Sequence, residues 1–114
     1  MTLDEIQALH VQLIAKLIEW AFAAGYTLAW AEAYRTPQQA ALNAQAGVEI
    51  AASLHTQRLA VDFVLRKDGV YLTETSDYAP LGAYWKSLHP LACWGGDFST
   101  PDGDHFSLTW MGVK

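Results

Sequence analysis

The segment Leu59–Leu65, which reads LAVDFVL, restricts the possible folds more than any other part of the sequence. Its apolar residues alternate as they do in a buried strand. The next four residues, RKDG, are typical of a tight turn because Asp-Gly tolerates positive φ, and the following VYL would return antiparallel. Strands gathered as hairpins, rather than as strand–helix–strand units, favour an antiparallel sheet within an α+β fold.

The rest of the chain supplies helices and further strands around this hairpin. Thr2 and Glu5 have the spacing of a capping box, and apolar residues recur at helical spacing after them. Thr36, Pro37 and Gly47 have the positions of a cap, a first helical residue and a stop. The sequence therefore predicts a small antiparallel sheet packed with about three helices. The expected helices are 2–24, 36–47 and 76–88, a loop covers 48–53, and the expected strands are 26–35, 59–65, 70–72 and 105–110.

Composition narrows the possible functions. With 114 residues, 52% of them apolar and 17% charged, the chain is most simply one globular domain. Its net charge of −5 and its lack of a basic run argue against a dedicated binder of nucleic acid or of anionic membranes. The first residues, MTLDEIQ, lack the layout of a signal peptide, and no apolar stretch is long enough to span a bilayer. We therefore expect a monomer without a membrane anchor that is cytoplasmic as synthesised.

A carboxylate inside the apolar strand raises the question of its partner. Asp62 lies within LAVDFVL, and a buried carboxylate is costly unless it is paired, hydrogen-bonded or bound to a metal. His55 precedes it by seven positions, and His105 closes the acidic loop DGDH; both stand at loop-to-strand junctions. Two imidazoles and one carboxylate could bind zinc and leave a fourth position open. Structural roles for these side chains remain an alternative, whereas His10 and His89 lack such partners and suggest surface or core positions.

Three short motifs carry a resemblance to a known family. SLHTQRLAVDF, residues 53–63, resembles the Ser-x-His-x6-Asp signature of the zinc D-alanyl-D-alanine carboxypeptidase family, which includes the L-alanyl-D-glutamate endopeptidases used as phage endolysins. WGGDFSTPDGDHFSL resembles the closing Asp-x-x-His pattern through Asp102 and His105, and AYRTPQQ resembles the Tyr-Arg-Thr motif. The motifs occur in family order between Tyr34 and Leu108. Their order makes the combination more specific than any one of them.

The resemblance implies a role for individual residues of one catalytic domain, residues 1–114. It implies that a Zn²⁺ ion at one end of the sheet is bound by His55, Asp62 and His105. It makes Asp102 the catalytic acid and base, and Arg35 the residue that steadies the substrate carbonyl. Asp104 is the competing base, but we expect it to point to the opposite face from a strand-borne ligand. Many family members have Gly where this chain has Arg58, which we expect at the rim of the cleft.

The implied activity is hydrolysis of the stem peptide of bacterial peptidoglycan. The favoured form is an L-alanyl-D-glutamate endopeptidase, a phage or prophage lysin that acts on the cell wall after its release. The alternatives are a D-alanyl-D-alanine carboxypeptidase and a non-catalytic zinc-binding module of the same fold. Around the cleft, Glu32 suggests a salt-bridge partner, and Trp94, Gly95 and Gly96 suggest either a cleft wall or, for Trp94, a core position.

Overall fold

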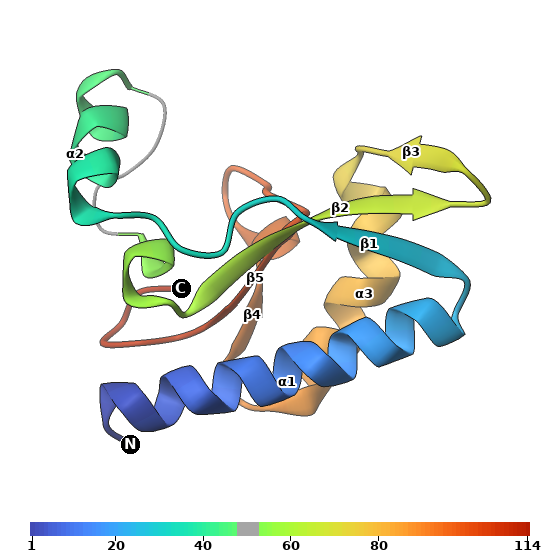
Figure 1. The fold of residues 1–114 in the computed structure, drawn as a ribbon, viewed down its shortest axis with the longest axis horizontal. Helices are drawn as coiled ribbons and strands as arrows, with labels where there is room; N and C mark the ends of the chain where they lie inside the picture. The colour runs from blue at the N-terminus through green and yellow to red at the C-terminus, as the bar shows by residue number, and fades with distance from the viewer. Residues whose placement is uncertain (48–52) are drawn as a thin grey trace.

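The computed structural model describes residues 1–47 and 53–114, so the loop predicted for 48–53 lies, apart from Ser53, outside the described residues. These residues form an α+β fold with a small antiparallel sheet, as the sequence predicts (Figure 1). Its helices are α1 (Leu3–Ala23), α2 (Pro37–Gln45) and α3 (Thr75–Leu88), with two short 3-10 helices, η1 (Leu54–Gln57) and η2 (Gly95–Asp97). Its strands are β1 (Tyr26–Trp30), β2 (Ala60–Lys67), β3 (Val70–Leu72), β4 (Ala92–Trp94) and β5 (His105–Leu108).

The sheet is organised around β2, the longest strand. Its order is β1-β2-β5-β4, and β3 pairs with the far end of β2. The predicted hairpin is confirmed: Val70 pairs with Lys67 across a turn in which Asp68 and Gly69 have φ values of 52° and 77°. Both values lie in the left-handed region that an Asp-Gly turn accommodates. The first half of β2 pairs with β5, and this pairing places Asp62 opposite His105.

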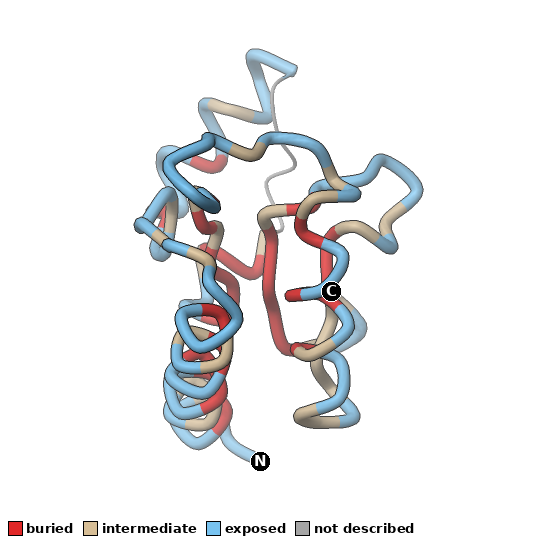
Figure 2. The backbone as a smooth tube through the Cα atoms, turned by 90° about the vertical axis from the view of Figure 1, so that its right-hand side faces the viewer, coloured by how far each residue is buried: buried red, intermediate tan, exposed pale blue. Residues whose placement is uncertain are grey.

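The helices close the core against the sheet. The capping box of Thr2 and Glu5 is present at the start of α1, and α2 begins after the Thr36 cap with Pro37 in its first turn. Helices α1 and α3 lie together beside the sheet, whereas α2 stands apart at one end (Figure 1). Buried positions follow the side of α1 that faces the strands (Figure 2). None of the described helices is both long enough and apolar enough to cross a bilayer.

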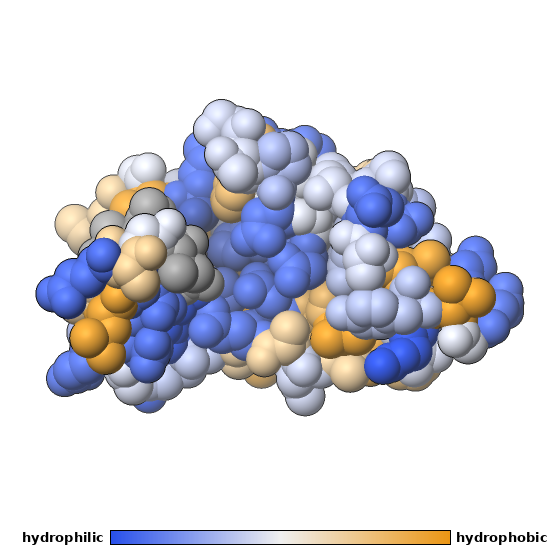
Figure 3. All heavy atoms as spheres, turned by 90° about the horizontal axis from the view of Figure 1, so that it is seen from above, coloured by the Kyte–Doolittle hydropathy of each residue, from blue (hydrophilic) through white to orange (hydrophobic). Residues whose placement is uncertain are grey.

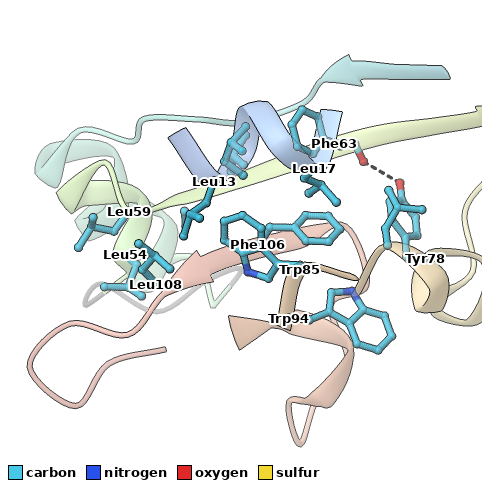
Figure 4. Close-up of a cluster of buried hydrophobic side chains, with 14 of the residues drawn as sticks. Leu13, Leu17, Leu54, Leu59, Phe63, Tyr78, Trp85, Trp94, Phe106 and Leu108 are labelled. Atoms are coloured by element: carbon cyan, nitrogen blue, oxygen red, sulfur yellow. Dashed lines mark hydrogen bonds between the residues drawn. The ribbon is translucent and has the colours of Figure 1, made fainter. Parts of the chain in front are cut away.

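The largest buried side chains of the core come from two helices and two strands. Leu17 of α1, Phe63 of β2, Phe106 of β5 and Trp85 of α3 meet between the helices and the sheet (Figure 4). The Tyr78 hydroxyl donates to the Phe63 carbonyl at 2.6 Å, so its one polar group is satisfied inside this cluster. This packing fixes β2 and β5 against each other, and with them the positions of the side chains that the strands carry.

Two predicted strands are shorter in the structure than in the sequence interpretation. The first ends at Trp30, not at residue 35, although the backbone of Ala31 and Glu32 still exchanges hydrogen bonds with Asp62. The last ends at Leu108, because the backbone then forms a turn in which Trp110 pairs with Val113. Strand β4 was not predicted.

Candidate metal and catalytic site

Three elements bring the predicted metal ligands together. Asp62 is the third residue of β2 and His105 the first residue of β5, and the two are direct partners in the antiparallel pairing. His55 arrives from η1, whose first turn is capped by the Ser53 side chain, which accepts a hydrogen bond from the His55 backbone N–H. Ser53 therefore shapes the turn that precedes β2. The sequence predicted this convergence from loop-to-strand junctions, and the described residues bear it out geometrically.

The ligand atoms lie close together and are poorly satisfied. Asp62 Oδ1 is 3.3 Å from His55 Nε2 and 3.4 Å from His105 Nδ1. It is buried and has no hydrogen-bond partner among the described residues. His55 Nδ1 faces the Ala33 carbonyl at 3.3 Å, an arrangement that orients the ring so that Nε2 points toward Asp62. A buried carboxylate oxygen without a well-formed hydrogen bond is costly, so a cation bound at this point would stabilise the arrangement.

Electrostatics favours a charged carboxylate between two imidazoles. Burial tends to raise the pKa of Asp62, but the facing rings of His105 and His55 outweigh it and lower the pKa to about 2. Burial also tends to lower the pKa of His55, yet the Asp62 carboxylate leaves that pKa above its usual value. In the absence of a metal, a proton on the His55 ring would compensate the charge of Asp62. A bound cation would replace that proton.

The donor set and its spacing fit zinc. Zinc bonds of about 2.0–2.1 Å to nitrogen and oxygen place neighbouring corners of a tetrahedron about 3.3–3.4 Å apart. The two measured distances from Asp62 Oδ1 agree with that edge, and one ligand atom from each of His55, Asp62 and His105 lies within 4.8 Å of the others. Three protein ligands of this kind leave a fourth corner open. The residues present therefore fit a catalytic zinc.

A cavity of ≈ 530 Å³ opens beside the cluster. The segment that connects η2 to β5 forms one of its sides, and hydrophilic residues gather around a hollow in the middle of the face seen in Figure 3. Asp102 lies on this segment with a side chain that is 53% exposed, and its Oδ2 is 3.9 Å from His105 Nδ1. The cavity lining contains all five predicted site residues: Arg35, His55, Asp62, Asp102 and His105.

Asp104 also lines this cavity, so the expectation that it points to the opposite face is wrong. Carboxylate oxygens of Asp62, Asp102 and Asp104 lie within 4.8 Å of one another. Burial, together with the neighbouring carboxylates of Asp102 and Asp62, raises the pKa of Asp104 well above its usual range. The alternation argument fails because β5 begins only at His105, so the residue before it belongs to a turn.

Arg35 is buried at the edge of the cavity and is paired with Glu32. Its Nη2 donates to Glu32 Oε1, and its Nε lies 3.4 Å from Glu32 Oε2. The same carboxylate is 3.7 Å from His55 Nδ1, so it lies between the arginine and a predicted ligand. Arg35 therefore pairs with Glu32, the alternative to a catalytic role, and also belongs to the lining of the cavity. The salt bridge predicted for Glu32 is confirmed.

The loop that carries Asp102 is held by residues to which the sequence analysis gave another role. A Cβ on Gly95 would lie 2.1 Å from the Asp102 carbonyl oxygen and 2.7 Å from His105 Cβ, so only glycine fits there. The Gly95 carbonyl accepts from the Asp102 N–H, and the buried Trp94 indole donates to the Gly103 carbonyl at 2.7 Å. Trp94, Gly95 and Gly96 are not in the lining of the cavity, so the expected cleft wall is not found there, and Trp94 has its other predicted position, in the core. The WGGD run indicates a constrained backbone, but the sequence does not show that Gly95 and Trp94 contact Asp102 and Gly103.

The other two histidines and Arg58 lie outside the cavity lining. His10 is a satisfied core residue, as expected: it is buried and contacts the Phe106 carbonyl at 3.2 Å through Nε2. His89 Nδ1 accepts from the Leu91 N–H. Arg58 ends η1 with a φ of 57°, a left-handed conformation that glycine adopts without strain, and it does not reach the rim of this cleft.

Comparison with known proteins identifies sequence and structural relatives. The sequence profile of the family described as D-alanyl-D-alanine carboxypeptidase matches residues 46–108, which is more than half of the chain. The structure is similar to that of the L-Ala D-Glu endopeptidase ChiX of Serratia marcescens, with a TM-score of 0.74 and 25% sequence identity. That match covers 88% of this chain and 77% of the Serratia chain. No curated protein shows significant sequence similarity to the chain.

Proposed function

The chain belongs to the D-alanyl-D-alanine carboxypeptidase family of peptidases, and on that basis we propose that it is a zinc-dependent hydrolase of the peptidoglycan stem peptide. One observation carries the proposal. A buried Asp62 oxygen that makes no hydrogen bond faces two imidazole nitrogens at 3.3 and 3.4 Å. The cavity beside it is also lined by the exposed Asp102. This combination of ligands and a nearby exposed carboxylate suits metal-assisted hydrolysis.

His55, Asp62 and His105 would hold the zinc, whose positive charge would supply a lower pKa for water and stabilisation of the oxyanion. Asp102 is the proposed general base and acid. Its carboxylate would take a proton from the water whose oxygen bonds to the scissile carbonyl carbon. It would then deliver that proton to the departing amine nitrogen as the C–N bond breaks, so that the products are a carboxylic acid and an amine. Because Asp102 is exposed at the cavity, its carboxylate can contact both the water and the departing amine.

Arg35 is the proposed donor to the substrate carbonyl oxygen. Its guanidinium is planar and permanently charged, so it could stabilise the oxygen as negative charge develops. The pairing with Glu32 supports this role because it fixes the orientation of a long side chain before substrate binds. The negative charge of Glu32 would also offset the positive charge of Arg35 near His55.

The two candidate activities, endopeptidase and carboxypeptidase, differ in the peptide bond that is cleaved. The Serratia relative, described as an L-Ala D-Glu endopeptidase, supports cleavage between the first two residues of the stem. The description of the matching family supports removal of a terminal D-alanine instead. We propose the endopeptidase because that likeness extends over most of the chain in three dimensions.

A defined muropeptide with a complete stem distinguishes these activities. Mass spectrometry of the products should show one cut after L-alanine and no released D-alanine. Release of D-alanine alone would establish the carboxypeptidase. No hydrolysis by zinc-loaded protein, together with retained zinc, would establish the non-catalytic module. The role as a phage or prophage lysin stays a prediction of the resemblance, and lysis of bacteria on co-expression with a holin tests it.

A further inference from the structure

A second groove lies next to the catalytic cavity, and residues 33–35 separate the two. It has a volume of ≈ 320 Å³ and runs between α1 and the residues that follow β1. Its floor is small or apolar, with Ile14, Ala33, Ala60 and Val61 among its residues. Its two aromatic residues, Trp30 and Tyr34, are 63% and 42% exposed. An apolar groove that keeps large aromatic side chains exposed is more typical of a ligand site than of ordinary surface.

The aromatic side chains are held in fixed positions by neighbours. Trp30 packs on the Phe63 ring, with the ring centroids 5.0 Å apart. The Arg58 guanidinium lies over the Tyr34 ring at 4.0 Å from its centroid. Arg58 adopts this position with a left-handed backbone, although a side chain is strained there. The result is a rigid wall of two aromatic rings with a cationic hydrogen-bond donor beside one of them.

We propose that this groove binds the glycan strand of peptidoglycan, through the ring of an N-acetylated amino sugar. The axial C–H groups of a pyranose form an apolar face that packs on an aromatic ring, and its hydroxyl groups lie around the edge, where Arg58 can donate to them. An acetamide methyl group would contact the apolar floor. A neutral sugar needs no charge partner, so a mostly apolar groove whose polar residues are Tyr34, Arg58 and the buried His10 suits it.

The position of the groove supports this occupant rather than an unrelated one. Ala33 and Tyr34 line the groove, and the next residue, Arg35, lines the catalytic cavity. The Ala33 carbonyl lies 3.3 Å from His55 Nδ1, so a single stretch of backbone separates the sugar site from a predicted ligand. The stem peptide is attached to the sugar through a lactyl group, so the bond after its first residue is about two residue lengths, roughly 7 Å, from the ring.

This inference rests on the proposed function for the identity of the polymer, but its test does not require hydrolysis. Wild-type protein and variants are titrated with peptide-free glycan strands and with soluble oligomers of N-acetylglucosamine, and binding is measured by calorimetry. We expect saturable binding that Trp30→Ala and Tyr34→Ala each weaken by about tenfold or more. The matched control is Tyr71→Ala, because Tyr71 is also exposed (57%) and also stacks with an arginine, Arg66, but lies on β3. That variant should bind as the wild type does.

A second measurement separates this site from the catalytic one. Trp30→Ala should hydrolyse a free stem peptide at the wild-type rate while its release of peptides from intact cell walls falls. Failure of the proposed function would appear as no hydrolysis of either substrate, whatever the glycan affinity. The inference is overturned if wild-type protein does not bind glycan, or if Trp30→Ala and Tyr71→Ala bind equally well. It is also overturned if sedimentation shows a dimer that Trp30→Ala dissociates, because a second copy would then occupy the groove.

Discussion

The predicted ligand cluster and the loop that carries Asp102 lie side by side but are held in different ways. His55, Asp62 and His105 are buried or half-buried and come from η1 and from paired strands, so sheet register fixes their spacing. Asp102 is exposed and depends on Gly95, on Trp94 and on backbone hydrogen bonds within the loop. A metal ligand needs a fixed position, whereas a proton carrier must contact water and a leaving group. The ligands are thus held by paired strands and a capped turn, as a metal site requires, and Asp102 by an exposed loop, as a proton carrier requires.

The largest effect should come from breaking the fixed half of this comparison. His105→Ala removes one of three ligands, so we expect loss of zinc binding and of all measurable hydrolysis. Wild-type protein should contain about one zinc per chain, as measured by elemental analysis after metal-replete expression. His89→Ala is the matched control, because His89 lies outside the cavity and should leave both properties unchanged. Wild-type protein that contains no zinc under these conditions would contradict the ligand assignment.

The next effect concerns the exposed half. Asp102→Asn should retain zinc and the fold but lose turnover by roughly two orders of magnitude or more, because an amide cannot carry the proton. Asp104→Asn is the comparison variant and should be milder, although both carboxyl groups face the cavity. Steady-state kinetics on a stem peptide, with zinc content measured in parallel, decides between them. A larger loss for Asp104→Asn would transfer the role of base to that residue.

Substitution of Arg35 tests whether a third catalytic group acts together with the metal ligands and Asp102. Arg35→Ala should cost about 3 kcal/mol of transition-state stabilisation, the scale for loss of one oxyanion donor. Arg35→Lys should also impair turnover, because an ammonium group lacks the planar fork of donors. Zinc content and melting temperature should stay near those of the wild type. Arg66→Lys on the outer part of β2 is the control, and wild-type kinetics for Arg35→Ala would leave zinc and Asp102 as the only catalytic groups.

The sequence was sufficient for those parts of the site that depend on local patterns. Alternation in LAVDFVL predicted β2, which carries Asp62, and the Asp-Gly pair predicted the hairpin that follows it. The role of Asp62 as a ligand still came from the family resemblance. Capping residues likewise predicted where α1 and α2 begin.

The parts that could not be predicted depend on contacts between distant residues. Strand β4 has only three residues, too few to show alternation, and it exists because Ala92–Trp94 pair with β5. The direction of Asp104 depended on the residue at which β5 begins, a boundary that sequence patterns do not fix. The need for glycine at position 95 arises from the approach of the Asp102 carbonyl, seven residues further along the chain.

The smallest predicted effect sharpens the comparison by using a buried histidine that is not a ligand. Burial lowers the pKa of His10 to about 4, although the Phe106 carbonyl opposes this shift. In the unfolded chain the pKa of histidine is about 6.5. Between these values the unfolded state binds more protons, so the free energy of unfolding should decrease as the pH falls from about 7 to about 4. For this group alone the decrease is on the order of 3 kcal/mol.

His10→Gln tests this by removing the titration while keeping a donor for the Phe106 carbonyl. Urea unfolding curves for both proteins, measured with a chelator present so that metal release does not contribute, should converge as the pH falls toward about 4. The cluster histidines and Asp62 contribute equally to both proteins, so the difference between the curves isolates His10. Curves that stay parallel across this range would mean that the pKa of His10 is the same in the folded and the unfolded chain. Burial on α1 would then not disfavour the charged imidazole.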